Sequence, residues 1–402
     1  MNFAAAERRH CLRMKKKYKV HLLIESSRAS GRDLLKGIAR YARHHGDWSF
    51  YWETGGLESR RARLKKLDVN GIISRDLASS KAQMRQLNIP AVVVGHRDRE
   101  ASGLINVVTD SKNIGRMAAE HLLQCGFKHF AFCGLARARL EQTPWSEERL
   151  KAFRARIQTA GFSAPGKFVL PPPGADWEKS RRHLADWLAA QPQPLGVMAC
   201  NDDCGAQVAE ACKLAGLAVP DTVGIVGVDN DEVVCGLTDP PMTSVAVNFE
   251  QAGYAAAAAL EKLMSRAKHP PSDIVVSATH LVARRSTDAV AVENVAVAKA
   301  LRFIRHQIRR PFSVNEIALA AGTSRRALER RFRETMGRSI LQEIRRARAD
   351  EIARLLLETN LPVSGIATAL GFGDAQHIAR YFHAAKKTSP LAFRKAHGRP
   401  AH

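Results

Sequence analysis

Residues 313–332 read SVNEIALAAGTSRRALERRF, and this stretch decides the fold of the C-terminal part of the chain. Ser313 and Glu316 have the spacing of a capping box, in which each side chain satisfies a backbone N–H at the start of a helix. Gly322 then interrupts the pattern as a turn residue, and Ser324 is placed to cap a second, arginine-rich helix. The stretch therefore predicts a helix, a glycine-centred turn and a second helix.

Residues 363–382, VSGIATALGFGDAQHIARYF, repeat this pattern with the turn at Gly371-Phe372-Gly373. Between the two units, apolar residues at helical spacing predict one long helix over residues 339–358. A helix fits the major groove of DNA, where arginine can read guanine, glutamine can read adenine, and further Lys and Arg neutralise phosphates. Two such units joined by one helix could contact successive major-groove segments about 34 Å apart. We therefore expect an all-α tandem helix-turn-helix domain that binds double-stranded DNA.

The charge of the chain is concentrated at its two ends. The 402 residues contain 62 Lys and Arg against 39 Asp and Glu, a formal net charge of +23. Residues 295–402 hold 21 Lys and Arg against 8 Asp and Glu, and residues 1–19 hold 7 against 1, so the 275 residues between them are nearly neutral. A polyanionic partner is thus expected for the C-terminal domain. For residues 1–17 we expect a disordered basic tail, with Met14 as an alternative start.

The neutral part of the chain alternates short apolar runs with helical segments. Residues 20–24 predict a buried strand, residues 31–44 predict a helix, and residues 196–199 and 223–227 predict two more buried strands. This alternation is typical of parallel sheets with helices on both faces, and its length indicates two sheets. We expect a two-lobed α/β domain with parallel sheets, followed by the all-α domain.

Polar residues follow three of the predicted strands, as Glu25-Ser26-Ser27-Arg28, Asn201-Asp202-Asp203 and Asp229-Asn230-Asp231. Ligands of open parallel sheets bind beyond the carboxyl ends of the strands. Carboxylates and amides at these ends suit a neutral polyhydroxylated ligand, because each sugar hydroxyl both donates and accepts hydrogen bonds. An alternative is that Asp202 or Asp229 only caps the following helix. The residues alone leave both interpretations open.

Several classes of protein are disfavoured by what the sequence lacks. The seven cysteines include no CxxC pair and mostly lie in apolar surroundings, which favours reduced core thiols over a metal site or a disulfide framework. No glycine-rich phosphate loop follows a strand, so we expect neither an enzyme nor a cofactor. No apolar run approaches the roughly 20 residues of a membrane span, and no secretory signal is found. A cytoplasmic protein is expected.

A series of short motifs then follows in one order: Asn201-Asp202, Gly216-Leu217-Ala218-Val219-Pro220, Val226-Gly227-Val228-Asp229-Asn230, Pro240-Pro241-Met242-Thr243-Ser244-Val245 and Gly253-Tyr254-Ala255-Ala256. Through these motifs, residues 18–288 resemble the effector domain of lactose- and galactose-repressor-type regulators, which is itself like periplasmic sugar-binding proteins. The resemblance implies that Asp229 and Arg149 bind the ligand. Arg149 is matched because it starts the run Arg149-Leu150-Lys151-Ala152-Phe153.

Three further residues are candidate ligand contacts. Asn201 and Asp202 lie at a predicted strand end. Trp145 is flanked by Pro144 and Ser146, which favours a loop position over the core, and an indole face stacks well on the apolar C–H face of a pyranose. We therefore expect Trp145 in a loop at the ligand.

The repressors begin with a helix-turn-helix, but only 17 residues of this chain precede the region that resembles the effector domain. Residues 296–397 instead resemble the DNA-binding domain of the arabinose-regulator (AraC/XylS) family, including the closing run Thr388-Ser389-Pro390-Leu391-Ala392-Phe393-Arg394. The resemblance implies base contacts from Arg326, Glu329 and Arg330 in the first unit and from Ala375, Gln376, Ala379 and Arg380 in the second. Because alanine side chains cannot hydrogen-bond bases, the second unit is expected to read less sequence. For Arg325 and Arg331 we expect phosphate contact or a solvated position.

A sugar-binding effector domain followed by an AraC-type domain is the architecture of the xylose operon regulator type, which this chain resembles. Arg284-Arg285-Ser286-Thr287-Asp288 would close the effector domain. The resemblance implies a sugar-responsive transcription regulator, an activator of pentose catabolism genes, with a monosaccharide such as D-xylose as effector. A purine or phosphosugar effector, and repression in place of activation, stay open.

The resemblance also implies partners and domain boundaries. The partners are operator DNA, RNA polymerase and a second copy of the chain in a homodimer, with no membrane contact. The expected domains are a tail over residues 1–17, an effector domain over residues 18–288, a linker over residues 289–298 and a DNA-binding domain over residues 299–397.

Overall fold

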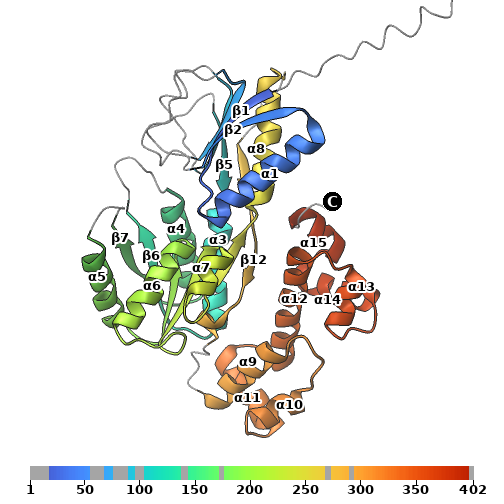
Figure 1. The fold of residues 1–402 in the computed structure, drawn as a ribbon. Helices are drawn as coiled ribbons and strands as arrows, with labels where there is room; N and C mark the ends of the chain where they lie inside the picture. The colour runs from blue at the N-terminus through green and yellow to red at the C-terminus, as the bar shows by residue number, and fades with distance from the viewer. Residues whose placement is uncertain are drawn as a thin grey trace, which may run out of the picture. The chain divides into compact units, whose positions relative to one another are not determined.

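The computed structural model describes residues 18–54, 68–75, 89–95, 104–136, 144–171, 176–267, 273–288 and 294–397 (Figure 1). The backbone falls into two compact units. The first comprises the described residues up to Val108 together with Phe249–Ile274, and the second comprises Thr109–Asn248 together with the described residues from Val275 onward. The expected effector domain therefore contributes to both units. The expected basic tail over residues 1–17 lies outside the described residues.

The first unit is built on a six-stranded sheet with the strand order β11-β5-β4-β3-β1-β2. Its strands are β1 (Tyr18–Leu23), β2 (Trp48–Glu53), β3 (Gly71–Arg75), β4 (Ala91–Val94), β5 (Ile105–Thr109) and β11 (Ile274–Val276). The pairings among β1 to β5 are parallel. β4 is buried along its whole length, as expected for a parallel strand covered on both faces.

Two helices of the first unit, α1 (Ala29–His45) and α8 (Phe249–Met264), pack closely on each other. A Cβ atom at Gly37 would collide with the carbonyl oxygen of Glu250, and one at Gly253 would collide with that of Leu34. Glycine is therefore required at both crossing points. Arg40 also bonds the carboxylate of Glu250 across the helix pair.

The second unit contains a six-stranded sheet with the order β12-β10-β9-β8-β6-β7. Its elements are β6 (His129–Leu135), β7 (Gly166–Leu170), β8 (Leu195–Ala199), β9 (Val223–Asp229), β10 (Thr243–Val247), β12 (Ala278–Val282), α3 (Ser111–Gln124), α4 (Pro144–Thr159), α5 (Trp177–Ala189), α6 (Asp202–Leu214) and α7 (Glu232–Leu237). β12 is antiparallel to β10, whereas the other pairings are parallel. The strands predicted over residues 196–199 and 223–227 lie within β8 and β9, whereas the antiparallel edge strand β12 was not predicted.

The rest of the second unit is a helical domain. Its helices are α9 (Val295–Gln307), α10 (Val314–Ala320), α11 (Arg325–Met336), α12 (Ile340–Glu358), α13 (Val363–Ala369), α14 (Ala375–Lys386) and α15 (Pro390–His397). The predicted capping box is present, with both hydrogen bonds between Ser313 and Glu316. Gly322 and Gly371 make their turns with φ of 68° and 66°, a region that glycine adopts without strain. α9 begins inside residues 289–298, the expected linker.

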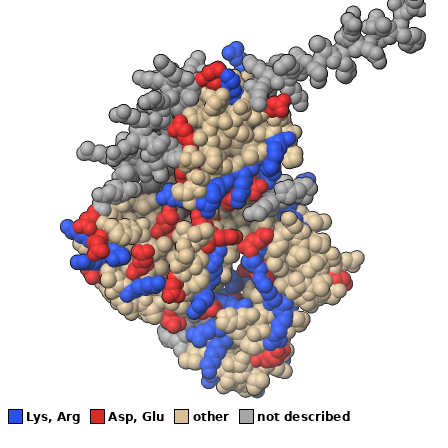
Figure 2. All heavy atoms as spheres, in the orientation of Figure 1, with Lys and Arg blue, Asp and Glu red and all other residues tan. Residues whose placement is uncertain are grey.

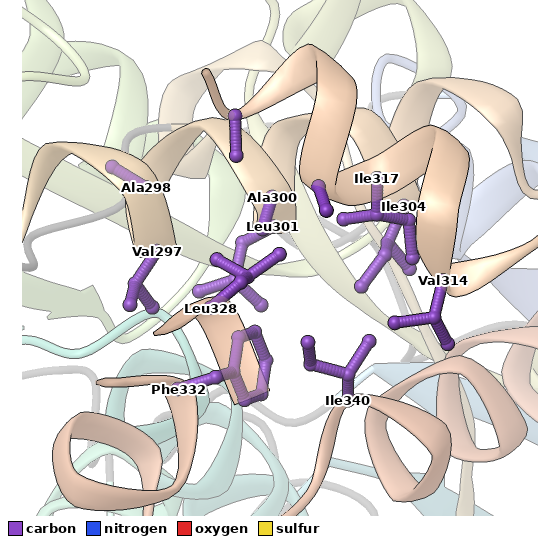
Figure 3. Packing of buried hydrophobic residues seen from close by; sticks show 12 residues of the cluster. Val297, Ala298, Ala300, Leu301, Ile304, Val314, Ile317, Leu328, Phe332 and Ile340 are labelled. Atoms are coloured by element: carbon purple, nitrogen blue, oxygen red, sulfur yellow. The ribbon is translucent and has the colours of Figure 1, made fainter. Parts of the chain in front are cut away.

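Each helix-turn-helix unit has its own apolar core. In the first, Leu328 and Phe332 of α11 pack together with Ile340 of α12 (Figure 3). In the second, Phe382 of α14 packs with Ile352 of α12. α12 therefore belongs to both cores, as expected for a helix that joins two repeated units.

The described residues also bear on the cysteines and on membranes. Six of the seven cysteines are described, and all six are unpaired and buried, as expected for core thiols, while Cys11 lies outside the described residues. The described part of the chain contains no cluster of three His, Cys, Asp or Glu side chains that could hold a metal ion. Within the same ranges no helix has both the length and the apolar character to cross a membrane.

Candidate functional site

Arg149 and Asp229, the two ligand residues implied by the resemblance, lie together in the second unit. Asp229 ends β9 with a φ of 105°, and Nη2 of Arg149 on α4 lies 3.8 Å from its Oδ1. A φ of this size is strained for a residue other than glycine, and strained residues cluster at functional sites. Arg149 is 3% exposed and also donates to the carbonyl of Cys200, which follows β8. Burial lowers the pKa of Arg149, and the charge of Asp229 opposes this shift.

Trp145 lies in the first turn of α4, so the expected loop position is wrong. The preceding Pro144 is the reason, because proline suits the first position of a helix, where its missing N–H costs nothing. Four residues further along the same helix face, the guanidinium of Arg149 lies 4.6 Å from the centroid of the indole ring. The indole therefore holds one side of the arginine that faces Asp229.

Asp202 is buried beneath the turn that carries Asp229. Its Oδ1 accepts the hydroxyl of Ser244 at 2.6 Å, and its Oδ2 accepts the backbone N–H of Asp231 at 2.7 Å. A Cβ atom at Gly227 would collide with Oδ1, so β9 passes directly over the carboxyl group. Burial and the neighbouring charge of Asp229 raise the pKa of Asp202 to about 8. These contacts point to Asp202 as a positioning residue for the turn, and its direct contact with a ligand stays a prediction.

Neither Asp202 nor Asp229 caps a helix in the structure, so that alternative is wrong. The cap of α6 is Asn201, whose side chain accepts the N–H of Cys204 at 2.9 Å. The cap of α7 is Asp231. Asn201 is half-buried, and its contact with a ligand stays a prediction.

The buried carboxyl of Asp202 predicts a pH-dependent stability. In the unfolded chain this group titrates near about 3.9, whereas in the folded chain its pKa is raised to about 8. Because the folded protein keeps the proton between these values, the contribution of Asp202 to the free energy of unfolding is largest at low pH and falls as the pH rises towards 8. We expect Asp202→Asn, which cannot ionise, to gain stability relative to the unsubstituted protein between about pH 5 and about pH 8. Urea denaturation measures this difference, and a difference that does not change with pH contradicts the raised pKa.

Arg284 is a residue near the site to which the sequence analysis gave no ligand role. Its Nη2 donates to Oδ1 of Asn230 at 2.8 Å, and its Nη1 donates to the carbonyl of Met242 at 2.9 Å. Arg284 thereby ties the turn after β9 to the segment that leaves the second sheet. Nothing local in the sequence could show this contact, because Asn230 lies 54 residues earlier.

A second polar pair lies in the first unit. Glu25 follows β1 and Arg75 ends β3, and Nη1 of Arg75 lies 3.3 Å from Oε1 of Glu25. Glu25 is buried, and among the described residues Nε and Nη2 of Arg75 find no hydrogen-bond partner. The run that begins with Glu25 was expected at a strand end, but Arg75 was not, because that arginine ends an apolar strand with no motif around it.

The predicted base-contacting residues of the first helix-turn-helix unit lie on α11. Arg326, Glu329 and Arg330 are all exposed. Glu329 accepts from Nε of Arg325 at 2.9 Å, and Nε of Arg330 lies 3.9 Å from Glu334. On the face drawn in Figure 2, Lys and Arg are likewise interspersed with Asp and Glu. Exposed ion pairs of this kind contribute only about 0–1 kcal/mol, so these arginines can exchange them for contacts with DNA.

The corresponding residues of the second unit lie on α14. Gln376 and Arg380 are exposed, whereas Ala375 and Ala379 are half-buried. On the opposite side of this helix, Phe382 is buried in the core of the unit. Of the four predicted contact positions on α14, two therefore present hydrogen-bonding side chains, and how much sequence this unit reads stays a prediction.

Two domain families and several whole proteins match the chain. Residues 119–287 match the periplasmic binding protein-like domain family, and residues 300–396 match a helix-turn-helix domain family. The xylose operon regulatory protein of Escherichia coli (strain K12) is 27% identical over 387 residues, which cover 94% of this chain and 97% of that protein. A solved structure of the xylose-binding transcription activator XylR matches with a TM-score of 0.59 and 26% identity, over 96% of this chain and 99% of that one. The chain is a homologue of the xylose operon regulatory proteins over nearly its whole length.

Two further proteins match the whole chain or its helical domain. The xylose operon regulatory protein of Haemophilus influenzae is 26% identical, over 94% of this chain and 98% of that protein. The multiple antibiotic resistance protein MarA of Salmonella typhimurium is 32% identical over 101 residues, which cover 25% of this chain and 76% of that protein. This xylose operon regulator homologue is thus a DNA-binding transcription regulator, and the predicted fold class is confirmed. The roles of its individual site residues stay predictions.

Proposed function

We propose that this chain is a sugar-responsive transcription activator whose effector is a monosaccharide, D-xylose or a closely similar pentose. The observation that carries the proposal is the pair of the buried Arg149 and the half-buried Asp229 at the carboxyl end of the second sheet. The related solved structure, which spans 96% of this chain, is described as a xylose-binding activator. That description supports the choice of a pentose over other sugars.

The chemistry of the pair suits sugar hydroxyls. A guanidinium donates hydrogen bonds, a carboxylate accepts them, and each hydroxyl can do both. The separation of 3.8 Å between Nη2 of Arg149 and Oδ1 of Asp229 is longer than a hydrogen bond. Among the described residues, Nε of Arg149 has no hydrogen-bond partner. The guanidinium of Arg149 therefore keeps a donor for a ligand, and hydrogen bonds to charged groups are stronger than those between neutral groups.

The remaining sensor residues complete this proposal. Asn201 and Trp145 supply further ligand contacts, and Asp202 holds the turn that carries Asp229. The effector domain spans residues 18–288 and the DNA-binding domain spans residues 299–397. A phosphosugar is disfavoured, because the carboxyl groups of Asp202 and Asp229 lie beside the one buried arginine of this cluster.

The helical domain of the chain binds operator DNA in this proposal. The basic charge of residues 295–402 neutralises phosphates, and Arg326, Glu329, Arg330, Gln376 and Arg380 contact bases. The active form is a homodimer in the cytoplasm that recruits RNA polymerase. We expect activation in preference to repression because the related structure is described as an activator.

Isothermal titration of the full-length protein tests the effector. The panel is D-xylose, L-arabinose, D-ribose, D-glucose and hypoxanthine. We expect a pentose to bind most tightly and hypoxanthine not to bind. If no sugar binds, the proposal of a sugar effector is wrong. If only hypoxanthine binds, the effector is a purine. Transcription in vitro with and without the bound sugar then distinguishes activation from repression.

A further inference from the structure

Helix α12 belongs to both helix-turn-helix units. Ile340 lies in the core of the first unit, and Ile344 and Ala347 pack against that core. Ile352 and Leu356 lie in the core of the second unit. Because one continuous helix carries both units, its orientation sets the directions of α11 and α14 together.

Near its N-terminal end, α12 contacts the α/β part of the second unit. Nη1 of Arg346 donates to Oε1 of Gln124, the last residue of α3. The same guanidinium is held by Glu343, through Nη2 at 2.6 Å and Nε at 3.3 Å. Glu343 is 2% exposed and also accepts from Nε of Arg338 at 2.6 Å. Burial raises the pKa of Glu343, but the charges of Arg346 and Arg338 outweigh burial and lower it. Glu343 therefore stays charged and presents Arg346 to α3.

At its C-terminal end, α12 makes a second contact with the α/β part. Oε1 of Glu358 lies 3.1 Å from Nε2 of His280 on β12. A helix rises 1.5 Å per residue, so Arg346 and Glu358 are separated by about 18 Å along α12. Two contacts so far apart fix the direction of a helix, whereas a single contact would leave it free to pivot. We name the contacts Gln124–Arg346 and His280–Glu358 the α12 seam.

The first helix of the helical domain is held beside the seam. Nη1 of Arg305 on α9 donates to the carbonyl of Thr287 at 3.0 Å, and its Nη2 donates to Sγ of Cys125 at 3.3 Å. The hydroxyl of Thr287 lies 2.8 Å from Nε2 of His121 on α3. Desolvation, with the charges of Arg305 and Arg346, lowers the pKa of His121 to about 3, so this ring is neutral at physiological pH. α9, α12 and α3 thus share one polar junction.

The seam is connected to the candidate ligand site through the second sheet. Asp229 on β9 is in register with Ala246 on β10, and Ala246 is in register with His280 on β12. Neighbouring strands lie about 4.8 Å apart, so His280 is roughly 10 Å from Asp229 across the sheet. Arg284, which holds Asn230, directly precedes the short 3-10 helix Arg285–Thr287. A movement of the turn after Asp229 can therefore be transmitted to the helical domain along two short paths. One crosses β10 to His280, and the other runs from Asn230 through Arg284 to residues 285–287.

We propose that the α12 seam is the surface through which the sensor sets the orientation of both DNA-reading helices. The partner of this surface is the chain's own α3 and β12, and the input is sugar binding at Asp229. Allosteric coupling requires an element whose state both sites bias. α12 is such an element, because it carries both DNA-reading units and is docked at two points. Gln124, Arg346, His280 and Glu358 are positioning residues, and their sugar dependence rests on the proposed function.

Position 124 allows a test in both directions. Gln124→Lys places an ammonium group against the guanidinium of Arg346 and repels it, whereas Gln124→Glu gives that guanidinium a charged acceptor. Adding His280→Ala to the lysine variant breaks both contacts of the seam. Arg309→Ala is the matched control, because it removes an arginine that pairs with Glu351 of α12 inside the helical domain.

Two measurements on the full-length protein separate docking from sugar action. Hydrogen exchange without sugar reports docking. We expect exchange in the last turn of α3 to be faster in Gln124→Lys and slower in Gln124→Glu, and exchange in β12 to be faster only in the double variant. The second measurement is the ratio of DNA affinities with and without D-xylose, on a duplex selected from a random pool. Couplings commonly amount to about 5- to 150-fold. We expect this ratio of DNA affinities to fall towards one in the double variant and to keep the value of the unsubstituted protein in Gln124→Glu and Arg309→Ala. Every variant should still bind D-xylose.

The outcomes decide the proposal in each case. The proposal is wrong if the double variant keeps both its hydrogen exchange and its ratio of DNA affinities. It is also wrong if the double variant loses the ratio while its hydrogen exchange stays unchanged, because the signal then passes through another surface. If the double variant does not fold, Gln124→Lys and Gln124→Glu alone must change exchange in opposite directions. If the unsubstituted protein binds no D-xylose, the proposed function fails, and the exchange comparison still decides whether the seam docks the helical domain.

Discussion

The Asp229→Ala protein is expected to lose its response to D-xylose while its DNA affinity without sugar stays unchanged. The substitution removes the acceptor and leaves the Arg149 guanidinium buried without its acidic neighbour. A hydrogen bond to a charged group contributes about 1.5–3 kcal/mol, so its loss should weaken sugar binding roughly 10- to 150-fold. Calorimetric titration with D-xylose measures the loss.

Asp221→Ala is the matched control for this prediction. Asp221 is exposed and precedes β9, so it lies at the opposite end of the strand that Asp229 terminates. The same charge change there should leave the affinity for D-xylose intact. Unchanged sugar affinity in Asp229→Ala removes Asp229 from the site. If that variant loses DNA binding as well, Asp229→Asn, which keeps an oxygen acceptor, separates misfolding from a specific loss.

The Arg330→Ala protein is expected to relax base preference at one base pair and to bind its preferred duplex about 1–3 kcal/mol more weakly. Arg330 is exposed on α11, and its nearest acidic partner, Glu334, lies 3.9 Å from Nε. This weak ion pair leaves the guanidinium able to meet the edge of a guanine. Competition binding with duplexes changed at each position measures both effects.

Arg325→Ala provides the comparison for Arg330. Arg325 begins α11 and donates to Glu329 at 2.9 Å, and we expect it to contact a phosphate or solvent. Loss of a phosphate contact weakens binding to all sequences alike and reduces its salt dependence. If Arg330→Ala shows the same uniform weakening, Arg330 contacts the DNA backbone and not a base.

Features that depend on neighbouring residues could be predicted from the sequence. The capping box of Ser313 and Glu316 and the turns at Gly322 and Gly371 are present as expected. The predicted strand over residues 223–227 lies within β9. Each of these depends on side-chain type and spacing over a few residues, which one sequence displays directly.

Features that depend on distant residues could not be predicted in the same way. Trp145 was expected in a loop, but it lies in a helix and its ring faces the guanidinium of Arg149. Asp202 was expected to contact the ligand because it follows a strand. The structure instead buries its carboxyl group against Asp231 and Ser244, which lie 29 and 42 positions later in the chain. Arg284 meets Asn230 only after the chain has passed through three further strands. These contacts require the completed sheet.

The sequence by itself determined the two architectures, the basic charge of the helical domain and the residue types available for sugar and DNA. Apolar periodicity, caps and charge act locally, so they can be recognised without a fold. The tertiary structure alone decided that Arg149 faces Asp229, that Asp202 holds the turn and that α12 contacts α3 and β12. Register across parallel strands and the packing of a helix on a sheet are set by residues far apart in the chain, and no local pattern records them.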